Sequence, residues 1–342
     1  MAESGIPNYL VQFAEAMYTG QNAHVLIGGT ISEIFCLSNG VRQGAILSPL
    51  FFNFYIDSII KNLKTTKIGC RLNYQMCNTI GYADDLVISA PTYTGLQRLL
   101  HIINLDLKEA DLPLNLNKSK VMIFTKRRKT RVYPRFTIDG GQIEFVENYK
   151  YLGVILNPQL NNRDDMSKAG KSHPRQFFPF FRKYGSCDED IKIFLYKTFC
   201  NSMFGIELWD SLDGSKMALK SLKITYHKCV KLLLGLPRWA SNHDTCDTLQ
   251  ILTLTHRINF ELFKFIFRLN DSLSPCIDPL RSYLLSKSSI VSNAIKIANE
   301  FYGITKLLDN DLDAIYARII YIQSTEPRSN YYNSGNTTGS LD

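Results

Sequence analysis

The sequence lacks any hydrophobic run long enough to cross a membrane. A transmembrane helix needs about 20 consecutive apolar residues, whereas the most apolar segments here are interrupted by lysine, arginine or asparagine well before that length. The residues after Met1 also lack the apolar core of a secretory signal peptide. We therefore expect an intracellular protein, nuclear or cytoplasmic, with no membrane partner.

The eight cysteines lack the spacing of a zinc site or of a redox motif. No two of them form a Cys-x-x-Cys pair, and the six histidines are scattered along the chain. Structural zinc sites use four such ligands at short, regular spacings. We therefore expect ordinary reduced thiols, and histidines that occupy core or surface positions.

Acidic residues are missing from one long basic stretch, residues 118–135. The net charge of the chain is +8, and this stretch alone contributes eight basic residues. They are Lys118, Lys120, Lys126, Arg127, Arg128, Lys129, Arg131 and Arg135. Such a run is either a solvated loop or a surface that binds the phosphates of a nucleic acid.

What the sequence does have is a core-forming composition, with 45% hydrophobic residues in 342, enough for two or three domains. Two adjacent acids, Asp84 and Asp85, separate the apolar segments 79–83 and 86–90, which have the length and composition of strands. We predict a β-hairpin with both acids at its tip, because aspartate tolerates the unusual backbone angles of tight turns. Neighbouring carboxylates repel unless divalent cations lie beside them, so the pair is a candidate metal site.

A second acidic pair, Asp164-Asp165, serves as a comparison. It has no apolar strand on either side. We therefore expect a solvated loop there.

Other patterns predict helices and a further hairpin. Apolar residues recur at helical spacing over residues 6–18, and Ser48-Pro49 can begin a helix that runs to about Leu63, with Ser48 as its cap. Gly28-Gly29, between two apolar segments, predicts a β-hairpin. Thr94 is expected to cap a helix that stops before Pro113.

Four motifs occur in order along the chain. They are residues 40–57 (GVRQGAILSPLFFNFYID), Tyr82-Ala83-Asp84-Asp85, residues 114–120 (LNLNKSK) and residues 149–156 (YKYLGVIL). In order and spacing they resemble the reverse transcriptase of non-LTR (LINE-like) retrotransposons, over roughly residues 5–270. Ala45 and Asp111 depart from the family pattern, in which a small polar residue or cysteine and a glycine are usual.

The resemblance implies an α+β fold. Residues 1–156 would form part of a right-hand polymerase palm, an antiparallel sheet with packed helices. Residues 157–322 would form an all-α, thumb-like helical bundle, because helical periodicity dominates there. Its basic side chains, among them Lys168, Lys171, Arg175 and Arg182, would line a duplex or face solvent. The polar residues 323–342 are expected to be disordered.

The resemblance also assigns site residues. Asp84 and Asp85 would be catalytic and would bind Mg²⁺ or Mn²⁺, and Lys118 would lie near the triphosphate. The nucleotide pocket would contain Arg42, Gln43, Gly44 and Tyr82. The residues expected to bind nucleic acid are Lys126, Arg127, Arg128, Lys129, Tyr151 and Gly153. Partners would be an RNA template, a DNA primer and dNTPs.

A carboxylate expected from the resemblance is missing. Two-metal polymerases need carboxylates from more than one strand, and the family carries one upstream of the segment that begins this chain. Glu3, Glu15 and Glu33 lack the required apolar strand context. We therefore expect an RNA-directed DNA polymerase fragment, a nucleotidyltransferase by family, that is inactive alone, as a truncated copy, an incomplete gene model or a product that has lost catalysis. The alternative is a non-catalytic RNA- or DNA-binding protein.

Overall fold

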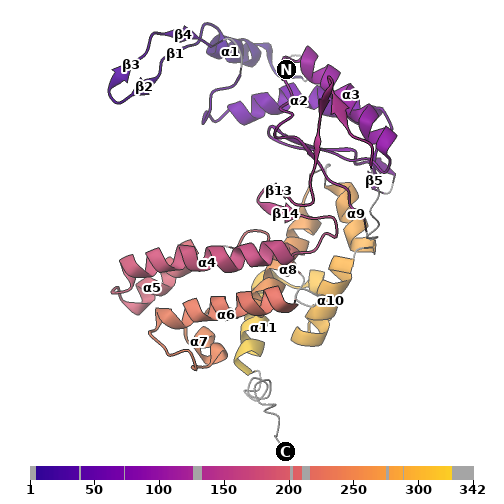
Figure 1. The fold of residues 1–342 in the computed structure, drawn as a ribbon. Helices are drawn as coiled ribbons and strands as arrows, with labels where there is room; N and C mark the ends of the chain where they lie inside the picture. The colour runs from indigo at the N-terminus through magenta and orange to yellow at the C-terminus, as the bar shows by residue number, and fades with distance from the viewer. Residues whose placement is uncertain are drawn as a thin grey trace, which may run out of the picture. The chain divides into compact units, whose positions relative to one another are not determined.

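The structure is a computed structural model that describes residues 5–37, 40–72, 74–125, 133–200, 203–209, 216–274, 277–287 and 289–325 (Figure 1). Two compact units make up the chain. The first comprises Met1–Ser119 and Tyr133–Ile143, and the second comprises Lys120–Val132 and Glu144–Asp342. The fold is α+β, as the sequence predicts, while the boundary expected at residue 157 and the palm and thumb identities stay predictions.

The first unit is built on helices α1 (Asn8–Tyr18), α2 (Ser48–Thr65) and α3 (Tyr93–Glu109). Pro49 lies in the first turn of α2, as predicted, but Leu47 and not Ser48 is the capping residue. The Ser48 hydroxyl instead donates a hydrogen bond to the carbonyl of Arg42 at 2.6 Å. Thr92, two residues before the predicted Thr94, caps α3 by accepting from the Gly95 N–H.

The core of the first unit lies between α2 and α3. Buried side chains from both helices form it, namely Ile56, Ile59, Leu63, Leu99, Ile103 and Leu107. Leu86 and Ile88, from the strand after the Asp pair, pack against this cluster. The apolar stripe that sequence periodicity predicts for α3 is therefore the face that meets α2.

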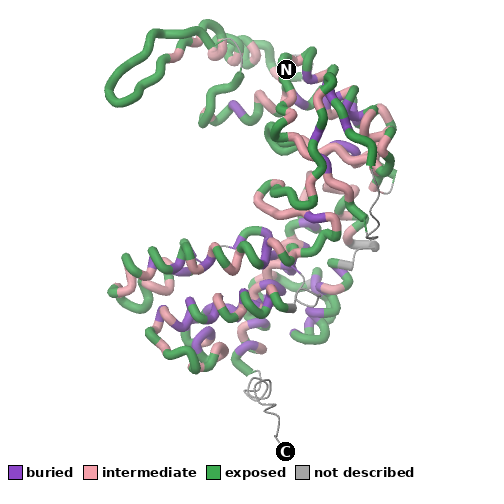
Figure 2. The backbone as a smooth tube through the Cα atoms, in the orientation of Figure 1, coloured by how far each residue is buried: buried purple, intermediate pink, exposed green. Residues whose placement is uncertain are grey.

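The strands of the first unit form short antiparallel pairs. Their bounds are β1 (Asn22–Ala23) with β4 (Phe35–Cys36), β2 (Leu26–Ile27) with β3 (Thr30–Ile31), β5 (Arg71–Leu72) with β6 (Gln75–Met76), β7 (Thr79–Tyr82) with β8 (Asp85–Ile88), and β10 (Thr137–Ile138) with β11 (Gly141–Gln142). The hairpin predicted at Gly28-Gly29 is confirmed, and both glycines have positive φ, 58° and 84°. Figure 2 shows that this β1–β4 arm is largely exposed.

The second unit begins with two strand pairs and continues as helices. Strand β9 (Lys120–Val121) runs parallel to β12 (Glu144–Phe145), and β13 (Tyr149–Tyr151) pairs antiparallel with β14 (Val154–Leu156). The helices are α4 (Arg163–Tyr184), α5 (Glu189–Leu195), the π-helix Tyr196–Cys200, the 3₁₀ helix η3 (Ile206–Leu208), α6 (Lys216–Leu233), α7 (Asn242–Thr248), α8 (Leu254–Asp271), α9 (Asp278–Lys287), α10 (Ser289–Tyr302), η4 (Leu307–Asp309) and α11 (Leu312–Thr325). The predicted helical character of this region is confirmed.

Two hydrophobic clusters stabilise the helices of the second unit. One joins α4, α6 and the start of α8 around Phe177, Tyr226 and Ile258. The other joins the rest of α8 to α10 and α11. The buried stretches along α4 and α6 are visible in Figure 2.

The acidic pair Asp164-Asp165 is not the solvated loop that the sequence predicts. Both residues lie in the first turn of α4, and Asp165 is only 8% exposed. The Asp165 carboxylate accepts the backbone N–H of Ile155 in β14, at 2.9 Å and 3.2 Å to its two oxygens. Burial raises the pKa of this carboxyl above its ordinary value. Asp165 therefore fixes the start of α4 to the β13–β14 hairpin.

We predict that Asp165→Ala lowers the free energy of unfolding by about 1–3 kcal/mol, because a buried N–H loses its acceptor. Asp165→Asn should cost less, since the amide oxygen still accepts. The matched control is Asp164→Ala, because its carboxylate makes only a 3.4 Å contact with Asn157. Urea unfolding of the three variants measures the effect. Equal losses for Asp165→Ala and Asp164→Ala would contradict this role.

Three histidines of the second unit are buried among its helices. His173 Nε2 lies 3.1 Å from the Tyr196 hydroxyl, and His256 Nδ1 lies 2.8 Å from the Tyr302 hydroxyl. His227 Nδ1 lies 2.8 Å from the carbonyl of Lys223. Burial lowers the pKa of each of these imidazoles from 6.5 to about 4. The expectation that histidines occupy core or surface positions is confirmed for these three.

These pKa values make the stability of the second unit depend on pH. The unfolded chain takes up protons near pH 6.5, whereas the folded histidines resist protonation until about pH 4. Stability is therefore lost as the pH falls through this window. We expect the urea midpoint to be lower at about pH 5 than at about pH 7. Replacing the exposed His24 and His101 by Gln should leave the difference between the two urea midpoints in place. A midpoint that is the same at both pH values would disprove the role of the buried histidines.

Candidate functional site

The two predicted catalytic acids lie at the tip of the β7–β8 hairpin, as the sequence predicts. The register pairs Tyr82 with Asp85 and Gly81 with Leu86, which leaves Ala83 and Asp84 as the connecting residues. Ala83 takes the left-handed backbone, with φ 50°, rather than either aspartate. The expectation that aspartate would supply the unusual angle is therefore wrong, although the turn itself is as tight as predicted.

The hairpin has one covered face and one exposed face. On the covered face, Leu86 and Ile88 pack against the α2–α3 cluster, and Thr79 is 4% exposed. A Cβ on Gly81 would lie 3.0 Å from Ile60 Cδ1 and 3.2 Å from Leu86 Cδ2, so a larger residue there would require these side chains to shift. On the other face, Tyr82 is 64% exposed opposite Asp85. Asp84 and Asp85 are both exposed.

A buried amide holds the base of the hairpin. Asn78 is fully buried, and its Nδ2 donates to the carbonyls of Leu63 at 2.7 Å and Ile68 at 2.8 Å. The Leu63 carbonyl belongs to the last turn of α2, where it also accepts the Thr66 hydroxyl at 2.7 Å. Asn78 also accepts at its own carbonyl from the Ser89 N–H at 2.8 Å. Sequence analysis missed Asn78, because no spacing marks a buried amide that pairs with distant carbonyls.

The residues predicted for the nucleotide pocket are divided between two places in the first unit. Tyr82 shares the hairpin face with Asp85. Arg42, Gln43 and Gly44 are exposed and lie in the segment before α2. The Arg42 side chain donates to the carbonyl of Met17, near the end of α1, at 3.0 Å. Gly44 has φ 82°, a backbone conformation that glycine adopts without strain. The structure therefore gives Arg42 a partner in α1, and its predicted contact with nucleotide stays a prediction.

Lys118 lies in the first unit in a turn organised by Asn115. The Asn115 side-chain oxygen accepts the backbone N–H of Lys118 at 3.2 Å, and the Asn115 carbonyl accepts from the Ser119 hydroxyl at 2.8 Å. This turn leaves the Lys118 side chain exposed. Its predicted place near a triphosphate stays a prediction.

Tyr151 and Gly153 belong to the β13–β14 hairpin of the second unit. Gly153 has φ 89°, and a Cβ there would lie 2.7 Å from Cε1 of Phe204. Lys168 Nζ donates to the Gly153 carbonyl at 2.8 Å. Gly153 therefore has a structural reason to be glycine, apart from the contact with a primer that the resemblance implies. The predicted nucleic-acid residues Lys126, Arg127, Arg128 and Lys129 lie outside the described residues.

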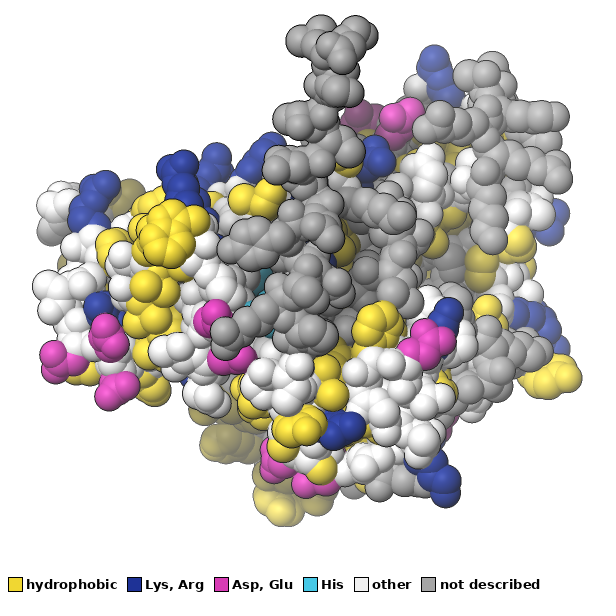
Figure 3. Space-filling model, turned by 90° about the horizontal axis from the view of Figure 1, so that it is seen from below, with side chains coloured by type: hydrophobic (Ala, Val, Ile, Leu, Met, Phe, Trp, Pro, Cys, Tyr) yellow, Lys and Arg dark blue, Asp and Glu magenta, His cyan; other side chains and the backbone are white. Residues whose placement is uncertain are grey.

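Helix α4 carries a row of basic residues on one face. Lys171, Arg175 and Arg182 are exposed and recur at helical spacing, with the 45% exposed Phe178 between them. Figure 3 shows lysine and arginine side chains standing among hydrophobic ones on the face that it draws. From the sequence, these basic residues were expected either to line a duplex or to face solvent. The aromatic ring of Phe178 within the row was not expected.

The hairpin tip can supply part of a metal site. Carboxylate oxygens are the ligands that Mg²⁺ prefers, and both acids are accessible. Over the described residues, however, the structure brings together no group of three or more His, Cys, Asp or Glu side chains able to hold a metal ion. An ion at the tip would need ligands beyond these two acids.

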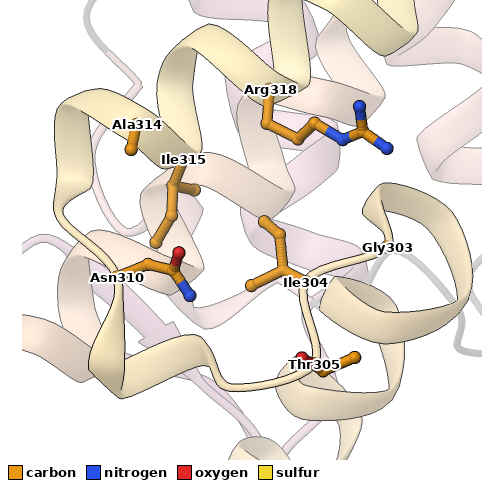
Figure 4. A pocket seen from close by; sticks show the side chains of 7 residues that line it. All are labelled: Gly303, Ile304, Thr305, Asn310, Ala314, Ile315 and Arg318. Carbon is orange, nitrogen blue, oxygen red and sulfur yellow. The ribbon is translucent and has the colours of Figure 1, made fainter.

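A separate pocket of about 260 Å³ lies in the second unit, between the end of α10 and α11 (Figure 4). It contains none of the predicted site residues. Its lining residues are Gly303, Ile304, Thr305, Asn310, Ala314, Ile315 and Arg318. Arg318 donates to the Tyr302 carbonyl at 2.9 Å, so this cation caps the end of α10. Among the helices that the structure describes, none is long and apolar enough to span a bilayer.

Comparison with known proteins agrees with the motifs. Residues 4–156 match the family model described as reverse transcriptase (RNA-dependent DNA polymerase). The chain is 31% identical over 161 residues, 44% of its length, to the Retrovirus-related Pol polyprotein from type-2 retrotransposable element R2DM of Drosophila melanogaster, of which the match covers 15%. It is 20% identical over 275 residues, 77% of its length, to the RNA-directed DNA polymerase from mobile element jockey of the same species, of which the match covers 29%.

A third relative, the Retrovirus-related Pol polyprotein from type-1 retrotransposable element R2 of Nasonia vitripennis, is 32% identical over 128 residues, 35% of this chain and 12% of the relative. The chain thus spans a minor part of the length of these relatives. The resemblance predicted from the four motifs is confirmed over residues 4–156, which match the reverse transcriptase family, and the relatives are polyproteins and polymerases of the R2 and jockey elements.

Proposed function

We propose that this chain is the part of an RNA-directed DNA polymerase that carries the Asp84-Asp85 hairpin. The observation that supports the proposal most is the geometry of this tip, which holds two accessible carboxylates on a hairpin packed against a helical core. The family match over residues 4–156 supplies the reaction class. Template RNA, primer DNA and dNTPs are the partners that the proposal requires.

Asp84 and Asp85 are the residues that would hold Mg²⁺ or Mn²⁺. When bound, such an ion supplies positive charge to the attacking primer oxygen and to the departing pyrophosphate. The chain fixes the position of these acids, because Leu86 and Ile88 pack against the core and Asn78, at the base of the hairpin, is hydrogen-bonded to α2. This fixed position favours catalysis, because carboxylates that are already positioned need no reorganisation when the substrate binds.

Other residues of the first unit serve the nucleotide in this proposal. Tyr82 lies opposite Asp85 on the exposed face, where its ring can contact the incoming nucleotide. Gly44 lets a substrate approach the backbone closely, and Arg42 and Gln43 flank it. Lys118 is an exposed cation that can donate a proton to the leaving pyrophosphate.

The second unit binds nucleic acid in this proposal. The row formed by Lys171, Arg175 and Arg182 presents positive charge at helical spacing, which suits a phosphate backbone. The exposed ring of Phe178 within the row can stack on an unpaired base. Tyr151 and Gly153 would contact the primer end, and Lys126, Arg127, Arg128 and Lys129 would add phosphate contacts.

A second candidate function is nucleic-acid binding without catalysis. The α4 row favours it, because those residues need no metal ion to bind phosphate. The hairpin tip favours polymerisation, because an exposed pair of adjacent carboxylates repels nucleic acid unless a cation neutralises it. Binding of a divalent ion at the tip therefore separates the two candidates.

We predict that Asp84→Asn combined with Asp85→Asn lowers the affinity for Mn²⁺ about tenfold or more, because both charged ligands of the tip are lost. Mn²⁺ titration followed by electron paramagnetic resonance measures the free ion. The matched control replaces Asp188 and Asp190, two exposed acids at the start of α5, by Asn. If both double variants bind Mn²⁺ as the original chain does, the hairpin tip is not a metal site.

A further inference from the structure

Cys70 and Cys77 lie opposite each other across the β5–β6 hairpin. The ladder pairs Arg71 with Met76 and Leu72 with Gln75. One step further, the N–H of Cys77 donates to the carbonyl of Cys70 at 2.9 Å. Residues that face each other at such a position have Cα atoms about 5.5 Å apart and side chains on the same face of the ladder.

Bridged cysteines have Cα atoms roughly 4.4–6.8 Å apart and Cβ atoms roughly 3.5–4.5 Å apart. The Cα spacing of a facing pair falls within this range, whereas Cβ atoms at a hydrogen-bonded position are nearer about 5.5 Å apart, so closure draws the two strands together at this point. Beside the thiols, a Cβ on Gly69 would lie 2.4 Å from Asn78 Cβ, and Gly69 has φ 111°, so this position needs glycine. Both cysteines are half-buried, so a small reagent can reach them.

The pair is hydrogen-bonded to the base of the Asp84-Asp85 hairpin. The Cys70 N–H donates to the Ser89 carbonyl at 3.1 Å, and the Ser89 hydroxyl donates to the Cys77 carbonyl at 2.8 Å. Ser89 directly follows β8, and its N–H donates to the carbonyl of Asn78. A covalent bond between the thiols would therefore restrain the segment from which the acidic hairpin extends.

The other described cysteines, except Cys187, which is half-buried as well, differ from this pair in their exposure. Cys200, Cys229 and Cys246 are buried, and desolvation raises their pKa values to about 11, 12 and 12. Because the thiolate is the reactive form, these three thiols are protected from disulfide exchange. Cys36 is exposed and donates to Asn22 Oδ1 at 3.3 Å, which makes it an accessible internal control.

We propose that Cys70 and Cys77 form a redox-active dithiol that closes to a disulfide by exchange with a small disulfide such as glutathione disulfide. This proposal does not depend on the polymerase reaction. One cysteine thiolate attacks a sulfur of glutathione disulfide, which forms a mixed disulfide and releases one glutathione. The second thiolate then attacks the protein sulfur of that mixed disulfide and releases the second glutathione. The two protons of the cysteines end on the two glutathione thiols, so the protein is oxidised and glutathione disulfide is reduced.

A disulfide between Cys70 and Cys77 would add a covalent bond to the hydrogen bonds that link these residues at the base of the Asp84-Asp85 hairpin. Disulfides in reducing compartments are usually regulatory or redox-sensing. The chemistry fits that role, because reduced glutathione reverses each step. The cross-strand position explains why sequence spacing alone missed the pair, since six residues separate the cysteines and no common motif has that spacing.

Peptide mapping of the full chain tests the proposal. The folded protein is equilibrated with glutathione disulfide, free thiols are blocked with iodoacetamide, and tryptic peptides are identified by mass spectrometry. Cleavage after Arg71 separates the two cysteines, so the disulfide appears as two linked peptides. We expect this linked species, its loss after dithiothreitol, and a monomer on a non-reducing gel. Cys36 should remain alkylated or carry glutathione.

A variant supplies the matched control. In Cys77→Ser, Cys70 should stop at the mixed disulfide and retain one glutathione, while circular dichroism confirms that the variant folds. The proposal is overturned if Cys70 and Cys77 are alkylated as readily as Cys36, if each keeps its own glutathione, or if the linked peptides come from two chains.

Discussion

The contact that the candidate site depends on is the attachment of the β7–β8 hairpin to α2 and α3. Leu86 and Ile88 bury one face of the hairpin, and the buried Asn78 amide donates to the carbonyls of Leu63 and Ile68. A buried amide left without these partners would cost about 1–3 kcal/mol. These interactions determine where Asp84 and Asp85 lie, although neither acid takes part in them.

The arrangement separates stability from chemistry. The residues that hold the hairpin are apolar or amide side chains on its covered face and at its base. The residues proposed to bind metal and nucleotide are exposed, and they make no contribution to the core. The second unit follows the same division, because α4 buries Phe177 against α6 while Lys171, Arg175 and Arg182 lie on exposed positions of the same helix. Substitutions at the acids should therefore change function without unfolding the chain.

Sequence reasoning succeeded where the signal is local. The hairpin around Asp84-Asp85, the Gly28-Gly29 hairpin and the helix after Ser48-Pro49 all follow from hydrophobic periodicity and turn chemistry, and the four motifs identified the family. It was inaccurate at helix caps, because Thr92 and Thr94 are equally good candidates until the first hydrogen bond of α3 is known.

Sequence reasoning failed where a residue acts through a distant partner. Asp165 was predicted to lie in a loop, because its sequence neighbours give no sign that it accepts a hydrogen bond from Ile155 in β14. Asn78 carried no signal, because the carbonyls it satisfies come from α2 and from Ile68. The pairing of Cys70 with Cys77 depends on strand register, which is not readable from cysteine spacing. All three depend on hydrogen bonds between particular residues, which hydrophobic periodicity does not reveal.

We propose that Asp84 and Asp85 alone cannot hold both metal ions of a polymerase reaction, which needs carboxylates from more than one strand. Primer extension on an RNA template, with the purified chain, dNTPs and Mg²⁺ or Mn²⁺, tests it most directly. We expect the chain and an Asp84→Ala, Asp85→Ala variant both to bind the primer-template and neither to extend the primer. Extension by the chain that disappears in the variant would overturn this proposal, because the two acids would then belong to a complete site.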